Sequence, residues 1–187
     1  MSGSLKRAFG LWVAAQVPGL HVHADGLANV SSAYPACTVT ELAHSLTRYG
    51  CGRRDFTERD PDSGDVVASG KLVRAETTYR LTLQAPSGPH GNGQEIVDAV
   101  LERLGEAVDE ANLAWSPLVL EDTETDPPEV FRLDRIAIEG WLALPPDVSG
   151  EPFLYRGSFS VRLARTVALT LPVEGIIEHI HLQEHGE

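Results

Sequence analysis

The sequence has little cysteine, few aromatic side chains, fewer basic than acidic residues and no long apolar run. Two cysteines among 187 residues, Cys37 and Cys51, are too few for a disulfide scaffold. A chain of this length buries an adequate core without one. Cys37 falls in a predicted strand, where we expect it to be a small buried residue, and Cys51 lies between two glycines. A disulfide or a shared metal site is therefore not the favoured interpretation.

Basic residues are much rarer than acidic ones: the sequence contains 15 basic and 27 acidic residues, which gives a formal net charge of −12. A negative surface repels phosphate groups, so we expect no direct nucleic-acid binding and favour partners with basic patches. No apolar run approaches the roughly 20 residues that span a bilayer, so we expect no membrane association. The apolar stretch at residues 9–17 is short, lacks a good cleavage site and is interrupted by Gly10 and Gln16. We do not interpret it as a signal peptide.

Catalytic motifs are also missing. There is no Gly-x-Ser-x-Gly turn and no Walker loop. The Gly-rich segment at residues 89–93 precedes a predicted helix, a place that can bind anions, but it has no Lys or Arg and favours a simple helix start. Asp134 and Glu139 fall in predicted strands, where surface ion pairing is the expected role. We therefore predict no catalytic residue and no enzymatic activity.

The histidines are the one candidate site. His21 and His23 alternate on a predicted strand, His179 and His181 do the same near the end of the sequence, and His185 follows. Two such pairs could hold a metal ion if the fold brought them together. Alternating histidines on an exposed strand more often form a polar face, so we expect no metal and no cofactor. A further histidine, His90, is expected in an exposed loop.

The first part of the chain predicts a helix over residues 5–17, because the apolar residues recur at helical spacing and Pro18 and Gly19 follow. A short strand is expected at residues 20–22 and a loop at 25–33. Pro35 cannot lie within a central strand, so the next strand is predicted over residues 36–46.

The middle of the chain begins with a polar stretch at residues 57–69, expected to be a hairpin tip or a mobile loop. Strict alternation predicts a half-buried strand at residues 72–85. A helix is predicted over residues 93–111, with Asn92 and Glu95 at the spacing of a capping box. Its apolar stripe comprises Ile96, Val97, Val100, Leu101, Leu104 and Val108.

The last part contains an acidic loop at residues 121–129, expected to be exposed and mobile. Strands are predicted over residues 130–144 and 153–171, with residues 145–150 as their connection and a polar tail at 176–187. We therefore predict an α+β protein, with a mainly antiparallel sheet packed against an N-terminal helix and one long amphipathic helix. The expected organisation is a single domain over residues 1–175, followed by the tail.

The order of these elements resembles that of the bacteriophage tail terminator family, which includes the lambda-type tail terminators and related neck and tail-completion proteins. The matching parts are the apolar first helix, the strand start at residues 34–39 (Tyr-Pro-Ala-Cys-Thr-Val), the polar hairpin region, the strand at 77–85, the helix at 93–111 and the C-terminal strands. They cover most of residues 5–171. The loops at 57–69 and 121–129 and the segment after Pro172 depart from the compact members.

The resemblance implies a structural virion protein that forms a ring of six copies on the head-proximal end of the tail tube. The ring would end tube polymerisation and offer the attachment face for the neck or head. The implied partners are other copies of the chain, the tail tube protein, a neck or head-completion protein and a tail sheath. The implied location is the virion, after assembly in the host cytoplasm.

Three alternatives stay open at this stage. The first is another phage neck or tail-completion protein, or the cap of a contractile injection system. The second is a metal-dependent hydrolase that uses the histidine pairs, and the third is a monomeric binding module of unrelated function. Particle location, metal analysis and oligomeric state respectively distinguish these alternatives.

Overall fold

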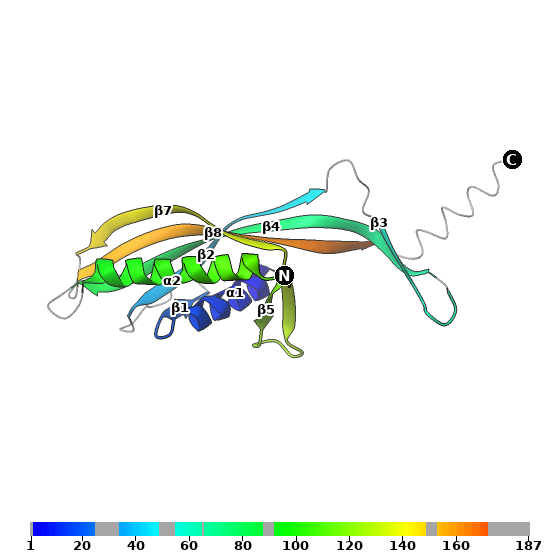
Figure 1. Cartoon of the computed structure of the whole chain (residues 1–187), viewed down its shortest axis with the longest axis horizontal. Helices are drawn as coiled ribbons and strands as arrows, with labels where there is room; N and C mark the ends of the chain where they lie inside the picture. Colours follow the sequence, from blue (N-terminus) through cyan, green and yellow to red (C-terminus); the bar gives the residue numbers. More distant parts are fainter. Residues whose placement is uncertain are drawn as a thin grey trace. The chain divides into compact units, whose positions relative to one another are not determined.

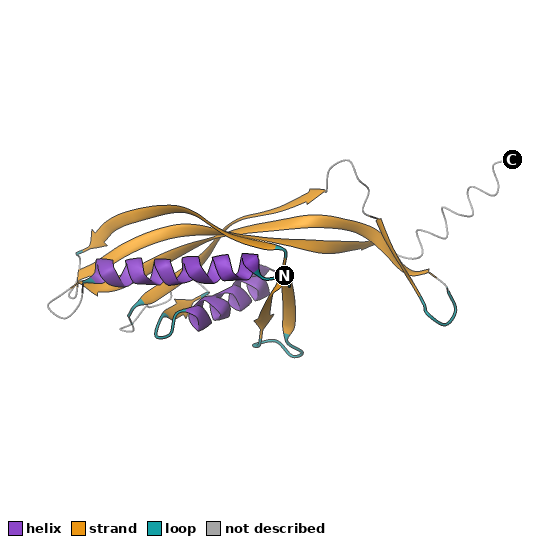
Figure 2. Ribbon diagram, viewed as in Figure 1, coloured by secondary structure: helices purple, strands orange, loops and turns teal. Residues whose placement is uncertain are grey.

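The computed structural model describes residues 2–24, 34–48, 55–64, 66–87, 92–148 and 153–171. It divides into two compact units: unit 1 contains Met1–His44 and Glu76–Arg165, and unit 2 contains Ser45–Ala75 and the chain from Thr166 onward. The predicted α+β class with a mainly antiparallel sheet is confirmed (Figure 2). The single domain expected over residues 1–175 stays a prediction, and the predicted tail lies outside the described residues.

Both helices of unit 1, α1 (Ser2–Gln16) and α2 (Gly93–Leu113), lie on the same face of the main sheet (Figure 1). The strand order of that sheet is β1-β2-β4-β8-β7, and β3 also pairs with β4. These strands are β1 (His21–His23), β2 (Ala36–Arg48), β3 (Asp55–Arg59), β4 (Val66–Ser87), β7 (Arg135–Asp147) and β8 (Phe153–Leu171). Strand β1 runs parallel to β2, whereas β7 runs antiparallel to β8.

The core of unit 1 lies between the helices and the sheet. Tyr79, Leu81 and Leu83 of β4 are buried, which confirms the predicted alternation, and the Phe9 ring of α1 stacks on Tyr79 with centroids 5.4 Å apart. The predicted stripe of α2 is also confirmed. Its fully buried members are Val97, Val100, Leu104 and Val108, with Ile96 and Leu101 partly buried against the same core.

The predicted ends of the elements are mostly close to the observed ones. Strand β2 begins at Ala36, as the preceding proline predicts. Asn92 caps α2, although its side chain accepts from the Gln94 N–H at 3.2 Å and not from that of Glu95. The helix then runs two residues beyond the predicted end at residue 111.

Two predictions for residues 118–147 are wrong, and the loop expected at residues 121–129 is right only in part. Strands β5 (Leu118–Asp122) and β6 (Glu129–Leu133) form a separate two-stranded sheet, whereas residues 123–128 connect them and are mostly exposed. The single strand predicted over 130–144 breaks at Asp134, because β6 pairs with β5 whereas β7 pairs with β8. Residues 145–147, expected in a connection, belong to the end of β7.

Unit 2 contains the β3–β4 hairpin, in which Phe56 pairs with Gly70. Its turn is organised by Asp60, whose carboxylate accepts the N–H groups of Asp62 and Ser63. The hairpin predicted for residues 57–69 is therefore confirmed, but more of the segment is strand than expected. A side chain at Gly70 would meet the Leu169 carbonyl and the Phe56 ring, so only glycine fits there.

Candidate functional site

The structure tests only part of the histidine hypothesis. His21 and His23 lie on β1, paired with Ala36 and Thr38, with His21 exposed and His23 half-buried. His90, His179, His181 and His185 lie outside the described residues. Within the described ranges, no group of three or more His, Cys, Asp or Glu side chains could hold a metal ion. The absence of a metal site in the whole chain stays a prediction.

The other candidate residues have ordinary structural environments. Glu139 forms an ion pair with Arg162 across β7 and β8 at 2.8 Å, the surface pairing that was predicted. Asp134 lies at the break between β6 and β7, where its N–H donates to the Ala164 carbonyl at 2.8 Å. Cys37 is fully buried, and burial raises the pKa of its thiol to about 12. The buried thiol is therefore neutral near pH 7 and not a ready nucleophile.

One buried ion pair was not predicted. The Asp122 carboxylate is completely buried and accepts from Arg7 at 2.7 Å and from the Ser4 hydroxyl at 2.6 Å. The hydrogen bonds from Arg7, then that from Ser4, lower the pKa of Asp122 to about 2. Arg7 and Asp122 are 115 residues apart, and nothing local in the sequence pairs them. The arrangement fastens α1 to the end of β5, which is a structural role.

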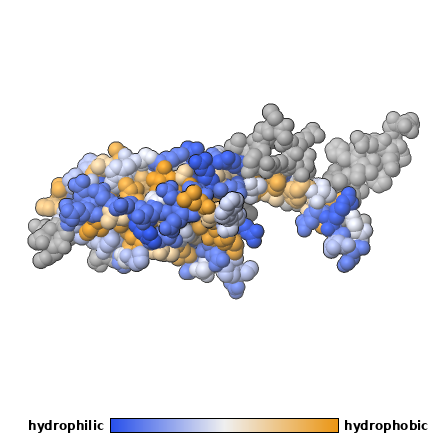
Figure 3. Space-filling view, in the orientation of Figure 1, coloured by the Kyte–Doolittle hydropathy of each residue, from blue (hydrophilic) through white to orange (hydrophobic). Residues whose placement is uncertain are grey.

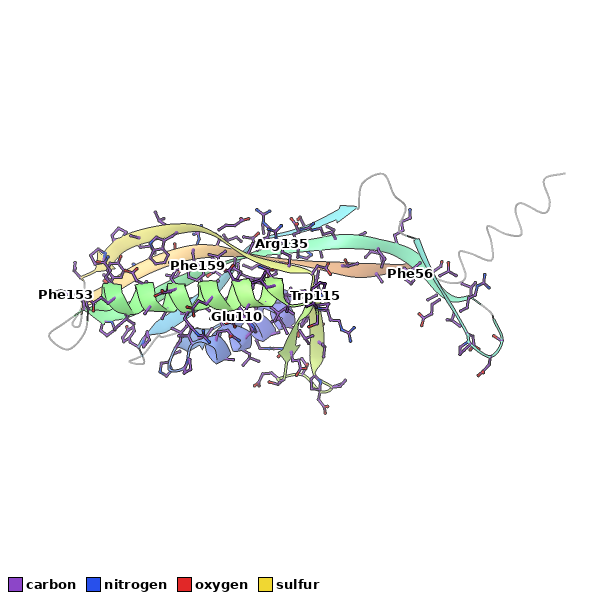
Figure 4. The ribbon with its side chains drawn as sticks, in the orientation of Figure 1. Phe56, Glu110, Trp115, Arg135, Phe153 and Phe159 are labelled. Carbon is purple, nitrogen blue, oxygen red and sulfur yellow. The ribbon has the colours of Figure 1, made fainter. Side chains whose placement is uncertain are left out.

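The most exposed aromatic side chain follows the end of α2. Trp115 is fully exposed, and Leu113 is 81% exposed. Beside them lies a cavity of about 250 Å³ between the end of α2 and the starts of β5 and β7, and Arg135 contributes to its lining. Figure 4 labels both Trp115 and Arg135. Asn112 joins the same elements through hydrogen bonds to the backbone of Ile136. Exposed tryptophans next to cavities are typical of protein interfaces, and sequence analysis missed this one.

The outer surface of α2 is largely hydrophilic (Figure 3), and most of its charged residues are acidic, so we call it the acidic helix face. One basic residue lies there, Arg103, which pairs with Glu106 at 2.9 Å. The last turn contains no basic residue, although a cation is favoured at a helix C-terminus. The six exposed carboxylates are Glu95, Asp98, Glu102, Glu106, Asp109 and Glu110, so the net charge of this face is −5.

The opposite surface of unit 1 is the side of the sheet that faces away from both helices, and we call it the arginine face. The register of β7 with β8 and the alternation along β4 place four arginines, two glutamates and one aspartate there. Its net charge is therefore +1, in a chain whose total is −12. Arg135, at the start of β7, also borders the cavity at the end of α2. The charged members of the arginine face are Arg80, Arg135, Arg156, Arg162, Glu76, Glu139 and Asp147.

The sheet also has open strand edges in unit 1. Strand β7 is the last strand in the order, and β1 pairs with β2 only at Ala36–Thr38. Open edges and an uncovered sheet face are surfaces that a neighbouring chain can use. The arrangement therefore offers several surfaces for protein contact and, among the described residues, no assembled catalytic group.

The described residues contain no helix that is both long and apolar enough to cross a membrane. No protein-family model matches this chain, and no curated protein matches it either.

Proposed function

We propose that this chain is a structural subunit of a bacteriophage tail, which forms a ring on the head-proximal end of the tail tube. The ring ends tube polymerisation and provides the face to which the neck or head attaches. The observation that carries the proposal is a set of surfaces on unit 1 that no other described element covers: a sheet face opposite both helices, open strand edges and the fully exposed Trp115. A subunit that works by contacting copies of itself needs such surfaces more than it needs a pocket.

The order of elements supports the choice of a tail terminator over other assemblies. An apolar helix comes first, followed by a strand that starts directly after Pro35, a polar hairpin, a long strand, a capped amphipathic helix and the C-terminal strands. The same order carries the resemblance found in the sequence. The β5–β6 hairpin is an addition that the sequence comparison did not anticipate.

The proposal defines the partners. Each copy contacts two further copies within a ring of six, the tail tube protein on one side of the ring and a neck or head-completion protein on the other. A contractile tail adds the sheath as a further neighbour. The role requires no cofactor and no enzymatic activity, and its location is the virion.

Tube polymerisation in solution tests this function. Purified tail tube protein from the same particle is allowed to polymerise with and without this chain, and tube lengths are measured by electron microscopy. We expect a small molar amount of the chain to stop growth and to bind at one tube end only. An unrelated protein of similar size and net charge is the control. Unchanged tube lengths, or binding along the whole tube, would contradict the proposal.

A further inference from the structure

We propose that copies of this chain associate head to tail, with the acidic helix face of one copy lying on the arginine face of the next. The inference rests on the proposed ring and identifies the two surfaces that form it. It depends on charge, on the placement of the two faces in unit 1 and on the length of the two charged rows.

Charge complementarity is the first argument. The acidic helix face has a net charge of −5, whereas the arginine face has +1 in a chain of −12. Two copies that approach through most other surfaces repel one another, but these two faces attract. Arginine and carboxylate groups also form the strongest paired hydrogen bonds available to side chains.

The second argument is that two charged residues on each face have no partner among the described residues of one copy. Arg80 and Arg135 are exposed and make no hydrogen bond or ion pair with any residue that the structure describes, and the same holds for Asp98 and Glu102. Acidic side chains three or four residues apart on a helix repel one another. The acidic helix face therefore carries a local repulsion that an arginine-bearing neighbour would relieve.

The third argument concerns symmetry. The two faces lie on opposite sides of unit 1, because α2 packs on one side of the sheet and the arginines lie on the other (Figure 1). A two-fold dimer through either face would bring like charges together. A head-to-tail contact brings unlike charges together and leaves an acidic helix face free at one end and an arginine face free at the other. Repetition of such a contact produces either a closed ring or an open filament.

The charged rows on the two faces have similar lengths, so they can lie along one another in this contact. The carboxylates from Glu95 to Asp109 span 14 helical steps, or about 21 Å at about 1.5 Å per residue. Arg156 and Arg162 are six strand residues apart on β8, or about 20 Å at about 3.3 Å per residue. Leu142 is 60% exposed on the arginine face, and Leu113 at the end of α2 and Trp115 just beyond it are exposed next to the acidic helix face, so each face also has an apolar contribution.

A charge exchange between the two faces tests the inference. One variant carries Asp98→Lys and Glu102→Lys, and the other carries Arg80→Glu and Arg135→Glu. Self-association of each is measured by analytical ultracentrifugation and by counting rings in electron micrographs, after circular dichroism has shown that the fold is retained. We expect each variant alone to associate about tenfold more weakly than the wild-type chain, because the net charge of the acidic helix face changes from −5 to −1 in the first variant and that of the arginine face from +1 to −3 in the second. An equimolar mixture of the two should recover association in pairs, because the unaltered arginine face of the first variant still attracts the unaltered acidic helix face of the second.

The control variant carries Glu121→Lys and Glu124→Lys, which change the net charge by the same +4 as the first variant but lie at exposed positions outside both faces. Variants that associate as the wild-type chain does, or a mixture that shows no recovery, would overturn the inference. If the variants nevertheless stop tube growth as well as the wild-type chain, the proposed function stands and only this interface is wrong. A wild-type chain that stays monomeric and never binds tube ends would contradict both proposals.

Discussion

Truncation of Leu104 to alanine is the most informative change in the core of unit 1. Leu104 lies on the stripe of α2 and is only 2% exposed, and it lines a void of about 10 Å³ together with Phe9, Leu81 and Phe159. The change removes three carbon atoms, each worth about 0.8 kcal/mol when buried. The cavity left behind adds a further cost, so we expect the free energy of unfolding to fall by about 3–5 kcal/mol.

Urea denaturation followed by tryptophan fluorescence measures this effect. All three tryptophans, Trp12, Trp115 and Trp141, belong to unit 1, so the signal reports on the unit that contains Leu104. With a denaturant dependence of about 2 kcal/mol per molar urea, the midpoint should fall by about 1.5–2.5 M. Leu113→Ala is the matched control, because Leu113 is on the same helix but 81% exposed. If the urea midpoint of Leu104→Ala fell by as small an amount as that of Leu113→Ala, the assignment of this stripe to the core would be refuted.

Three further predictions concern single residues. Because Asp122 has a pKa of about 2 when folded and about 4 when unfolded, its contribution to stability is present above pH 4 and lost as the pH falls towards 2. The stability difference between wild type and Asp122→Asn should shrink over that interval, and a constant difference would contradict the ion pair. Gly70→Ala should increase amide hydrogen exchange in the β3–β4 hairpin, because the added methyl group meets neighbouring atoms. Gly105→Ala has open space around it and should stabilise α2 by about 0.5–1 kcal/mol. If Gly70→Ala left exchange in the hairpin unchanged, the packing described at Gly70 would be refuted. In a Cys51→Ser background, Cys37 should react with a thiol reagent only after denaturation, and rapid labelling of the native chain would show that it is accessible.

The elements with strong local signals could be predicted from the sequence. Alternation along residues 72–85 and the stripe from Ile96 to Val108 identified the long strand and the long helix, because burial on one face leaves a regular pattern. Pro35 and Asn92 likewise marked the starts of β2 and α2. These positions depend on backbone chemistry within a few residues.

The features that depend on distant partners could not be predicted. Residues 121–129 are acidic and contain two prolines, which is typical of an exposed loop, yet Arg7 and Ser4 bury the Asp122 carboxylate. The break at Asp134 is invisible in the pattern because both neighbouring strands are apolar and alternate in the same way. Trp115 was missed because nothing in the sequence distinguishes a buried tryptophan from an exposed one after the end of a helix.

The location of this chain in an assembled particle tests the proposed function most directly. Under the proposed function, cryo-electron microscopy of the particle that contains this chain should show the folded unit 1 in a ring, at the junction between the last ring of a tail tube and the neck. Within that ring, the acidic helix face of each copy should lie against the arginine face of its neighbour. Density for the chain anywhere other than the head-proximal end of a tail, or its absence from the particle, would contradict the account.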